Sequence, residues 1–387
     1  MKRVMGILCS LLAFSVYAES ESDFYKNLIG NALTAESQLS IVRTVREAQI
    51  ADAGDFYVTA LDRVVQLYPN LRSNTEIAFA DEAIRIISDE LKEGQSETGQ
   101  NLWRVVITSS NPLVRSGAIM AIGKVGATDL TPQVLRLLIN MNSAPMASRL
   151  AGERLAYGAI ETLGQFKEEN AYIPVFLAAN GWYSDWVRAR ARELLPEIIS
   201  DPTAPLIEII QGPYSFEQKH LALRYLENAE GVDDASKSRA AVAALNEGWR
   251  IFSNTSDFKE IISMRKLALD MLRRYGTGDE SVYHLLDRSY RTGVDIEEKF
   301  AVIEVLATVH TENAAKMLAS YIELLNNKQE RGIVTPDDER SMRMLILALS
   351  SNGNSEVGRP VLRHTMSINW SHFIHNKTQE ALNNLGE

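Results

Sequence analysis

The 387-residue sequence has one cysteine, Cys9, and few aromatic residues, which make up 7 % of the chain. Cys9 lies in an N-terminal apolar segment that we expect to be removed, so the mature chain would lack disulfides, cysteine nucleophiles and cysteine-bound zinc. No later run approaches the roughly 20 apolar residues that cross a bilayer, which predicts no integral membrane segment. Acids outnumber bases, 50 against 40, and the formal charge of −10 disfavours nucleic-acid binding by phosphate neutralisation.

Residues 1–18 have the pattern of a secretory signal peptide. Lys2 and Arg3 precede an apolar stretch, and Val16 and Ala18 place small side chains at the positions that a signal peptidase recognises before Glu19. An uncleaved N-terminal anchor is the alternative interpretation. The short Lys-Arg start is typical of bacteria, so we expect export across the inner membrane to the periplasm.

From about residue 22 to the end, apolar residues recur at helical spacing, in segments separated by short polar breaks. Leu61, Val64, Val65 and Tyr68 form one such face. Sustained strand alternation is missing, and residues 103–108 are the one short ambiguous stretch. The pattern predicts an all-α fold.

The polar breaks contain helix start and stop signals. A side-chain oxygen can satisfy the free amides at a helix start, and a proline there loses nothing by lacking an N–H group. The expected starts are Asn111-Pro112, Thr131-Pro132, Thr335-Pro336 and two capping boxes, Ser215 to Gln218 and Asp295 to Glu298. The expected stops, each with a left-handed glycine, are Gly126, Gly212, Gly276, Gly293 and Gly353.

The sequence also repeats itself. The segment 114–123 recurs as 155–164 with the same Gly, Ala, Ile and Gly, and weaker copies begin at Val187, Leu221, Leu267, Phe300 and Ala381. A small residue would recur where two helices approach closely, and an apolar residue four positions later lies one turn along the same face. Spacings of this kind, with two helices per repeat, are typical of stacked helical hairpins.

These repeats resemble the HEAT repeat family. The resemblance lies in Asn111-Pro-Leu-Val-Arg115 followed by Ala118, in Asp185-Trp-Val-Arg188 followed by Ala191, and in Pro132 and Pro205 at the starts of following helices. It is clearest over 111–206 and weaker over 219–387. It implies a right-handed α-α superhelix, a solenoid in which each hairpin buries its apolar face against its neighbours. We accordingly divide the chain into a signal peptide (1–18), N-terminal helical pairs (19–100) and a HEAT-like solenoid (101–387) continuous with those pairs.

One position of the repeat is often basic. The residues three before each small residue are Arg115, Ala156, Arg188, Lys219, Arg265 and Glu298. Such a row could line a groove for an acidic ligand, or each base could pair with a carboxylate of the neighbouring repeat. In HEAT-like proteins these bases commonly bridge repeats, and an acidic chain supplies many partners, so we expect bridging.

The candidate binding surface is a group of aromatic and basic residues near one helix start. Large aromatic side chains and arginines dominate the energetics of protein interfaces when they are exposed. If buried, the same residues would fill the space between two repeats, and the sequence leaves both interpretations open. The group comprises Trp182, Tyr183, Trp186, Arg188 and Arg192.

The sequence contains little that indicates a metal site or a catalytic motif. His364, His372 and His375 form the one histidine cluster, but no carboxylate or cysteine lies between them, and we predict no metal and no other cofactor. No nucleophile elbow, zinc-protease motif or phosphate-binding glycine loop occurs. We therefore expect a non-catalytic scaffold or adaptor that binds another protein, for example in a flagellar-motor or envelope complex. The alternative is a periplasmic enzyme or small-ligand binder with a site on the concave face of the solenoid.

Overall fold

The computed structural model describes residues 20–143, 146–250, 257–278 and 280–386. Within these ranges the chain is all-α, as predicted: helices follow one another, joined by short turns, and no strand is present. None of these helices combines the length with the apolar character that crossing a membrane requires. The expected signal peptide, residues 1–18, lies outside the described residues.

The chain divides into two compact units, Met1–Ser200 and Asp201–Glu387. The boundary falls inside the segment 101–387, for which the repeat resemblance implies one continuous solenoid. The α-helices of the first unit are α2 (Glu21–Gly30), α3 (Ala35–Glu47), α4 (Gly54–Leu67), α5 (Asn74–Glu90), α6 (Gly99–Thr108), α7 (Pro112–Val125), α8 (Thr131–Asn142), α9 (Met146–Phe166), α10 (Tyr172–Ala179) and α11 (Asp185–Ile198). Its short 3-10 turns are η1 (Tyr68–Asn70), η2 (Ser96–Thr98), η3 (Thr128–Leu130) and η4 (Glu169–Ala171).

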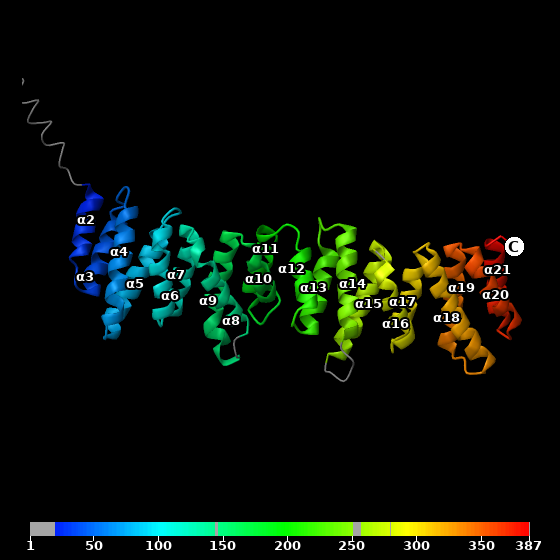
Figure 1. The fold of residues 1–387 in the computed structure, drawn as a ribbon. Helices are drawn as coiled ribbons and strands as arrows, with labels where there is room; N and C mark the ends of the chain where they lie inside the picture. The colour runs from blue at the N-terminus through cyan, green and yellow to red at the C-terminus, as the bar shows by residue number, and fades with distance from the viewer. Residues whose placement is uncertain (1–19, 144–145, 251–256, 279, 387) are drawn as a thin grey trace, which may run out of the picture. The chain divides into compact units, whose positions relative to one another are not determined.

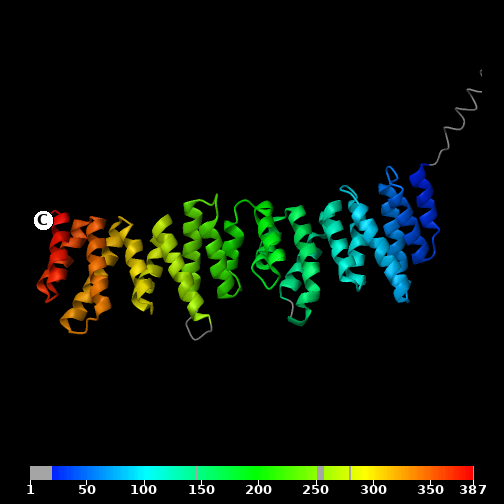
Figure 2. The same cartoon turned by 180° about the vertical axis from the view of Figure 1, so that it is seen from behind.

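The second unit is built in the same way. Its helices are α12 (Thr203–Gln211), α13 (Phe216–Asn228), α14 (Asp234–Arg250), α15 (Phe258–Tyr275), η5 (Glu280–Val282), α16 (Tyr283–Thr292), α17 (Ile296–Ala307), α18 (Glu312–Glu330), α19 (Pro336–Asn352), α20 (Ser355–Ser367) and α21 (His372–Asn384). In both views the helices of each unit follow one another in chain order (Figure 1, Figure 2).

Within each unit, helices pack against neighbours in the sequence. In the first unit α6 packs on α7, α8 on α9 and α10 on α11, and the second members of these pairs form one layer in which α7 contacts α9 and α9 contacts α11. In the second unit α14 packs on α15 and α18 on α19, while α13, α15, α17, α19 and α21 contact one another in turn. This neighbour-to-neighbour packing is the arrangement expected of helical hairpins that bury their apolar faces by stacking.

The repeated small residues lie where α7 and α9 approach closely. A Cβ atom added to Gly158 would lie 3.0 Å from the carbonyl oxygen of Ser116, and one added to Gly123 would lie 3.0 Å from Cα of Thr162. Thr162 Oγ1 also donates a hydrogen bond to the carbonyl oxygen of Ile119 across this contact, at 2.7 Å. A larger residue at Gly158 or Gly123 would therefore need the facing backbone to shift, as expected for a close approach of two helices. Gly117, the counterpart of Gly158 in the first copy of the repeat, has open space around it, so close approach does not explain the glycine there.

Most expected helix starts are confirmed. Asn111 caps α7 by accepting from the Leu113 amide, and Ser215 and Thr335 form capping boxes with Gln218 and Asp338.

Two expected starts were wrong in detail. Thr131 is the first residue of α8 and not its cap, and its hydroxyl donates to the carbonyl oxygen of Thr128. Asp295 caps α17 through the Glu297 amide, but Glu298 forms no capping box because its carboxylate pairs with Arg265 instead.

The expected glycine stops differ in conformation. Gly126 and Gly353 end α7 and α19 with φ angles of 76° and 79°, in the left-handed region that favours glycine, and Gly276 follows α15 with φ 90°. Gly212 and Gly293 follow α12 and α16 with φ angles of −81° and −60°. The prediction of a left-handed residue was therefore wrong for these two positions. Their φ angles are ordinary, but an added Cβ atom would lie 2.7 Å from the carbonyl oxygen of Glu208 at Gly212 and closer still to that of Ser289 at Gly293.

Candidate interaction surfaces

Two residues of the predicted binding group, Trp182 and Tyr183, anchor the loop between α10 and α11. The Trp182 indole Nε1 donates to the carbonyl oxygen of Met141 at 3.2 Å, and the Tyr183 hydroxyl donates to Oδ1 of Asn142 at 2.9 Å. Tyr183 is only 2 % exposed and Trp182 is half-buried. These two aromatic residues therefore fill the space between the loop and the end of α8.

Trp186, in the first turn of α11, is exposed, unlike Trp182 and Tyr183. Its side chain is 53 % exposed, and its ring centroid lies 4.6 Å from that of Tyr157 in α9. Arg188 pairs with Asp185 in the same helix, and Arg192 is exposed one turn further on. The structure thus separates the predicted group into a buried anchor and an exposed aromatic residue with a nearby arginine.

Further exposed apolar residues occur on the same layer of helices. Leu113 and Met120 of α7 are both exposed and lie two turns apart on that helix. Helix α9 lies between α7 and α11, because Ser116 Oγ donates to the carbonyl oxygen of Arg154 while Tyr157 contacts Trp186. Leu113, Met120, Tyr157 and Trp186 define what we call the α7/α9/α11 face. Its first three members could not be found from the sequence, because residue type does not distinguish an exposed Leu or Met, or a half-buried Tyr, from a core residue.

An ion pair borders this face. Arg190 of α11 donates two hydrogen bonds to the carboxylate of Glu161 in α9, at 2.7 and 3.1 Å. Burial raises the pKa of Glu161, but the hydrogen bonds from Arg190 and Tyr157 outweigh it and hold this pKa below its ordinary value. Glu161 is therefore charged at neutral pH and fixes the spacing of α9 and α11 next to Trp186.

Two hollows of the first unit have different chemical characters. One, of about 710 Å³, is lined by Lys124, Glu161, Arg190 and Glu197 among others. Several of these charged groups already have partners within the chain, since Glu161 pairs with Arg190 and Lys124 Nζ donates to the carbonyl oxygen of Asp89 at 2.6 Å. The other hollow, of about 570 Å³, lies between α6 and α8 and has mainly apolar walls.

The expected bridging of repeats by bases is confirmed at two positions of the second unit and was wrong at two of the first, where Arg188 pairs with Asp185 of its own helix and Arg115 donates to the carbonyl oxygen of Val106 in its own hairpin. Lys219 of α13 pairs with Glu247 of α14, and both side chains are buried. Arg265 of α15 donates two hydrogen bonds of 2.8 Å to Glu298 of α17. Each pair joins consecutive hairpins, so these buried charges serve the packing of the repeats.

The Arg265 guanidinium lies at the centre of a buried polar cluster. Its Cζ atom is 3.8 Å from the centroid of the Trp249 ring, and its Nη1 donates to the carbonyl oxygen of Gly248 at 3.2 Å. The Trp249 indole donates to Ser289 Oγ at 2.8 Å. Burial raises the pKa of Glu298 above its ordinary value, although Arg265 opposes this shift.

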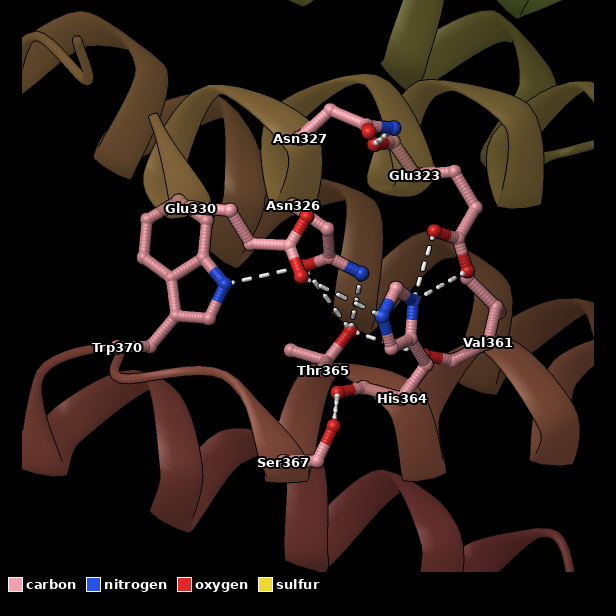
Figure 3. A network of polar contacts seen from close by, with 9 residues as sticks. All are labelled: Glu323, Asn326, Asn327, Glu330, Val361, His364, Thr365, Ser367 and Trp370. Atoms are coloured by element: carbon pink, nitrogen blue, oxygen red, sulfur yellow. Dashed lines mark hydrogen bonds and ion pairs between the residues drawn. The ribbon is translucent and has the colours of Figure 1, made fainter. Parts of the chain in front are cut away.

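The three clustered histidines take separate partners. His364 of α20 lies between two carboxylates of α18, with Nδ1 2.9 Å from Glu323 and Nε2 4.0 Å from Glu330 (Figure 3). His375 Nε2 is 2.9 Å from the carbonyl oxygen of Ile368, and His372 contacts Asn376. No group of three or more His, Cys, Asp or Glu side chains suited to a metal ion occurs within the part of the chain that the structure describes.

A buried amide lies next to His364. Asn326 of α18 donates to Thr365 Oγ1 at 3.1 Å and accepts from the Trp370 indole at 3.0 Å (Figure 3). This network joins α18 to α20 and to the turn that follows α20. The polar groups around His364 therefore serve to pack these helices together.

Comparison with known proteins assigns no family to this chain, since no family model and no curated protein matches the sequence.

Proposed function

We propose that this protein is an exported, non-catalytic interaction scaffold that binds another protein through the α7/α9/α11 face. The observation that carries the proposal is the exposure of Trp186 against Tyr157, with the exposed Leu113 and Met120 on the neighbouring helix. Aromatic side chains bury much area at little entropic cost, and they dominate the energetics of protein interfaces. A rigid layer of helices would present them in a fixed geometry.

The scaffold in this proposal is a HEAT-like right-handed superhelix of hairpins. Three features support it: the packing of each helix on its sequence neighbours, the glycine contacts between α7 and α9, and the buried ion pairs between consecutive hairpins. A stack of hairpins offers a long surface without a single large core, which suits a spacer or adaptor. A periplasmic assembly, such as a flagellar-motor or envelope complex, is the setting that we propose for it.

Export is the first part to test. If residues 1–18 are a cleaved signal peptide, the protein purified from the envelope fraction should begin at Glu19. N-terminal sequencing and intact mass measure this directly. A chain that retains Met1 in the cytoplasmic fraction would contradict the proposed compartment.

The binding face is tested by photo-cross-linking in the producing cells. A photoreactive amino acid at the exposed Met120 should give a discrete adduct with a partner protein, and Trp186→Ala should reduce this adduct at least tenfold because it removes the most exposed aromatic side chain of the face. The tilted contact between the Trp186 and Tyr157 rings contributes about 0.5–1.5 kcal/mol beyond the area that it buries, and about half of Trp186 is exposed, so the unfolding midpoint should change little.

The matched control is Ile139→Ala, which removes an exposed apolar side chain from α8 in the other layer of the unit. This variant should leave the Met120 adduct unchanged. If it removes the adduct as effectively as Trp186→Ala does, or if no adduct forms in the native protein, the α7/α9/α11 face is not the binding surface.

A further inference from the structure

The hollow between α6 and α8 belongs to the layer opposite the α7/α9/α11 face. Its walls are mainly apolar: Trp103, Val106 and Ile107 come from α6, while Pro132 and Leu137 come from α8. Ile107 is exposed despite its size. With a volume of about 570 Å³, the hollow falls within the range of clefts that hold small ligands or short peptide segments. We call it the α6/α8 groove.

Two arginines line this groove without a carboxylate partner. Arg136 of α8 is exposed, and Arg115 of α7 donates through Nε to the carbonyl oxygen of Val106 at 2.7 Å. Neither has an ion pair within the described ranges, in contrast to the paired Arg190 and Arg265. In a chain with a formal charge of −10, two unpaired cations in one apolar groove form a local positive site.

The remaining polar groups of the groove offset this positive charge only in part. Asp129 also lines the groove and accepts a hydrogen bond from Gln100 Nε2 at 3.1 Å, so two arginines face one carboxylate. The Oε1 atom of Gln133 is buried and has no hydrogen-bond partner within the described chain. An unsatisfied buried acceptor is unfavourable, so a rearrangement of this side chain toward an incoming donor would be favourable.

We propose that the α6/α8 groove binds an acidic, partly apolar polypeptide segment of a partner protein. Carboxylates of the segment would bind the guanidinium groups of Arg115 and Arg136, whose planar geometry matches a carboxylate. An apolar side chain would lie against Trp103 and Ile107. Peptide N–H groups would supply the donor that Gln133 lacks.

The charge balance favours a polypeptide over a nucleic acid. Nucleic-acid affinity comes mainly from neutralising many phosphates, and this groove offers two cations in an acidic chain. An acidic segment needs only two carboxylates, and its apolar residues make use of the walls. The site is independent of the α7/α9/α11 face, so either could fail without the other.

The test is selection from a random peptide display library against the full mature protein, with the Arg136→Glu variant as counter-target. Because Arg136 is exposed and makes no ion pair, this variant should fold normally. We expect the selected peptides to be enriched in Asp and Glu next to Leu or Phe. A selected peptide should bind Arg136→Glu at least tenfold more weakly, and its Asn/Gln analogue should lose at least tenfold in affinity for the native protein.

Arg104→Gln is the matched control for charge. It removes a cation from α6 that donates to Asn101 and does not line the groove, and it should retain native affinity. Trp186→Ala should also retain native affinity, which separates this site from the α7/α9/α11 face.

Four results would overturn the proposal: selected peptides without acidic enrichment, an equal loss of affinity in Arg104→Gln, no peptide that distinguishes Arg136→Glu from the native protein, or single-stranded DNA that binds more tightly than the peptides with the same dependence on Arg136.

Discussion

Replacing Glu298 by alanine should lower the free energy of unfolding of the second unit by about 3–5 kcal/mol, because it leaves the Arg265 guanidinium buried and unpaired. Glu298 is 0 % exposed and Arg265 is 4 % exposed. The two hydrogen bonds of 2.8 Å between them are the main compensation for taking both charges out of water. Removing one partner abolishes this compensation and keeps the desolvation cost.

The double variant Arg265→Met/Glu298→Leu should be less destabilising than Glu298→Ala alone. It removes both charges and keeps apolar volume between α15 and α17, and such replacements of buried ion pairs are often neutral or stabilising. Some loss will remain, since Arg265 also packs on Trp249 and donates to the carbonyl oxygen of Gly248. The comparison therefore separates the cost of an unpaired charge from the value of the pair.

Urea unfolding followed by tryptophan fluorescence and circular dichroism measures these differences. Lys266→Ala is the control, because Lys266 pairs at 3.1 Å with Asp295, the cap of α17, and both side chains are partly exposed. A partly exposed pair of this kind contributes about 0–1 kcal/mol. A Glu298→Ala variant that loses no more stability than Lys266→Ala would show that Arg265 finds water or another partner.

This ion pair also shows where sequence reasoning reaches its limit. The order Asp295 to Glu298 satisfies the local pattern of a capping box, just as Ser215 to Gln218 does, and the second box is confirmed. The carboxylate of Glu298 instead takes a partner 33 residues earlier in the chain. Local spacing predicts helix starts because a cap depends on adjacent residues, but it cannot weigh a distant guanidinium against a nearby amide.

The aromatic group near α11 shows the same limit for the candidate site. Tyr183 and Trp186 are three positions apart, yet one is buried and the other exposed, because the loop before α11 turns Tyr183 toward Asn142 of α8. The residue types identify the segment around residues 182–192 as a candidate surface. Tertiary contacts decide which of its side chains is exposed and can contact a partner. The α6/α8 groove could not be predicted at all, since it depends on the spacing of two helices that lie in different hairpins.

Replacing Leu272 by alanine should cost about 2–5 kcal/mol of unfolding free energy, the usual range for a fully buried leucine. Leu272 lies in the repeated segment that begins at Leu267, and its helix α15 packs on α13, α14 and α17. Urea unfolding of the second unit measures the loss. Leu347→Ala in α19 is the control, since Leu347 is exposed and its truncation should cost less than about 0.5 kcal/mol.

The distribution of this loss within the unit tests the stacked-hairpin proposal. If each hairpin is stabilised only by its neighbours, amide hydrogen exchange in Leu272→Ala should accelerate most in α13, α14, α15 and α17. Protection in α20 and α21 should change least, because these helices pack on each other and on α18 and α19. Equal acceleration in every helix would mean that the unit opens as one cooperative core, and a solenoid of hairpins coupled only to their neighbours would then be the wrong description of this chain.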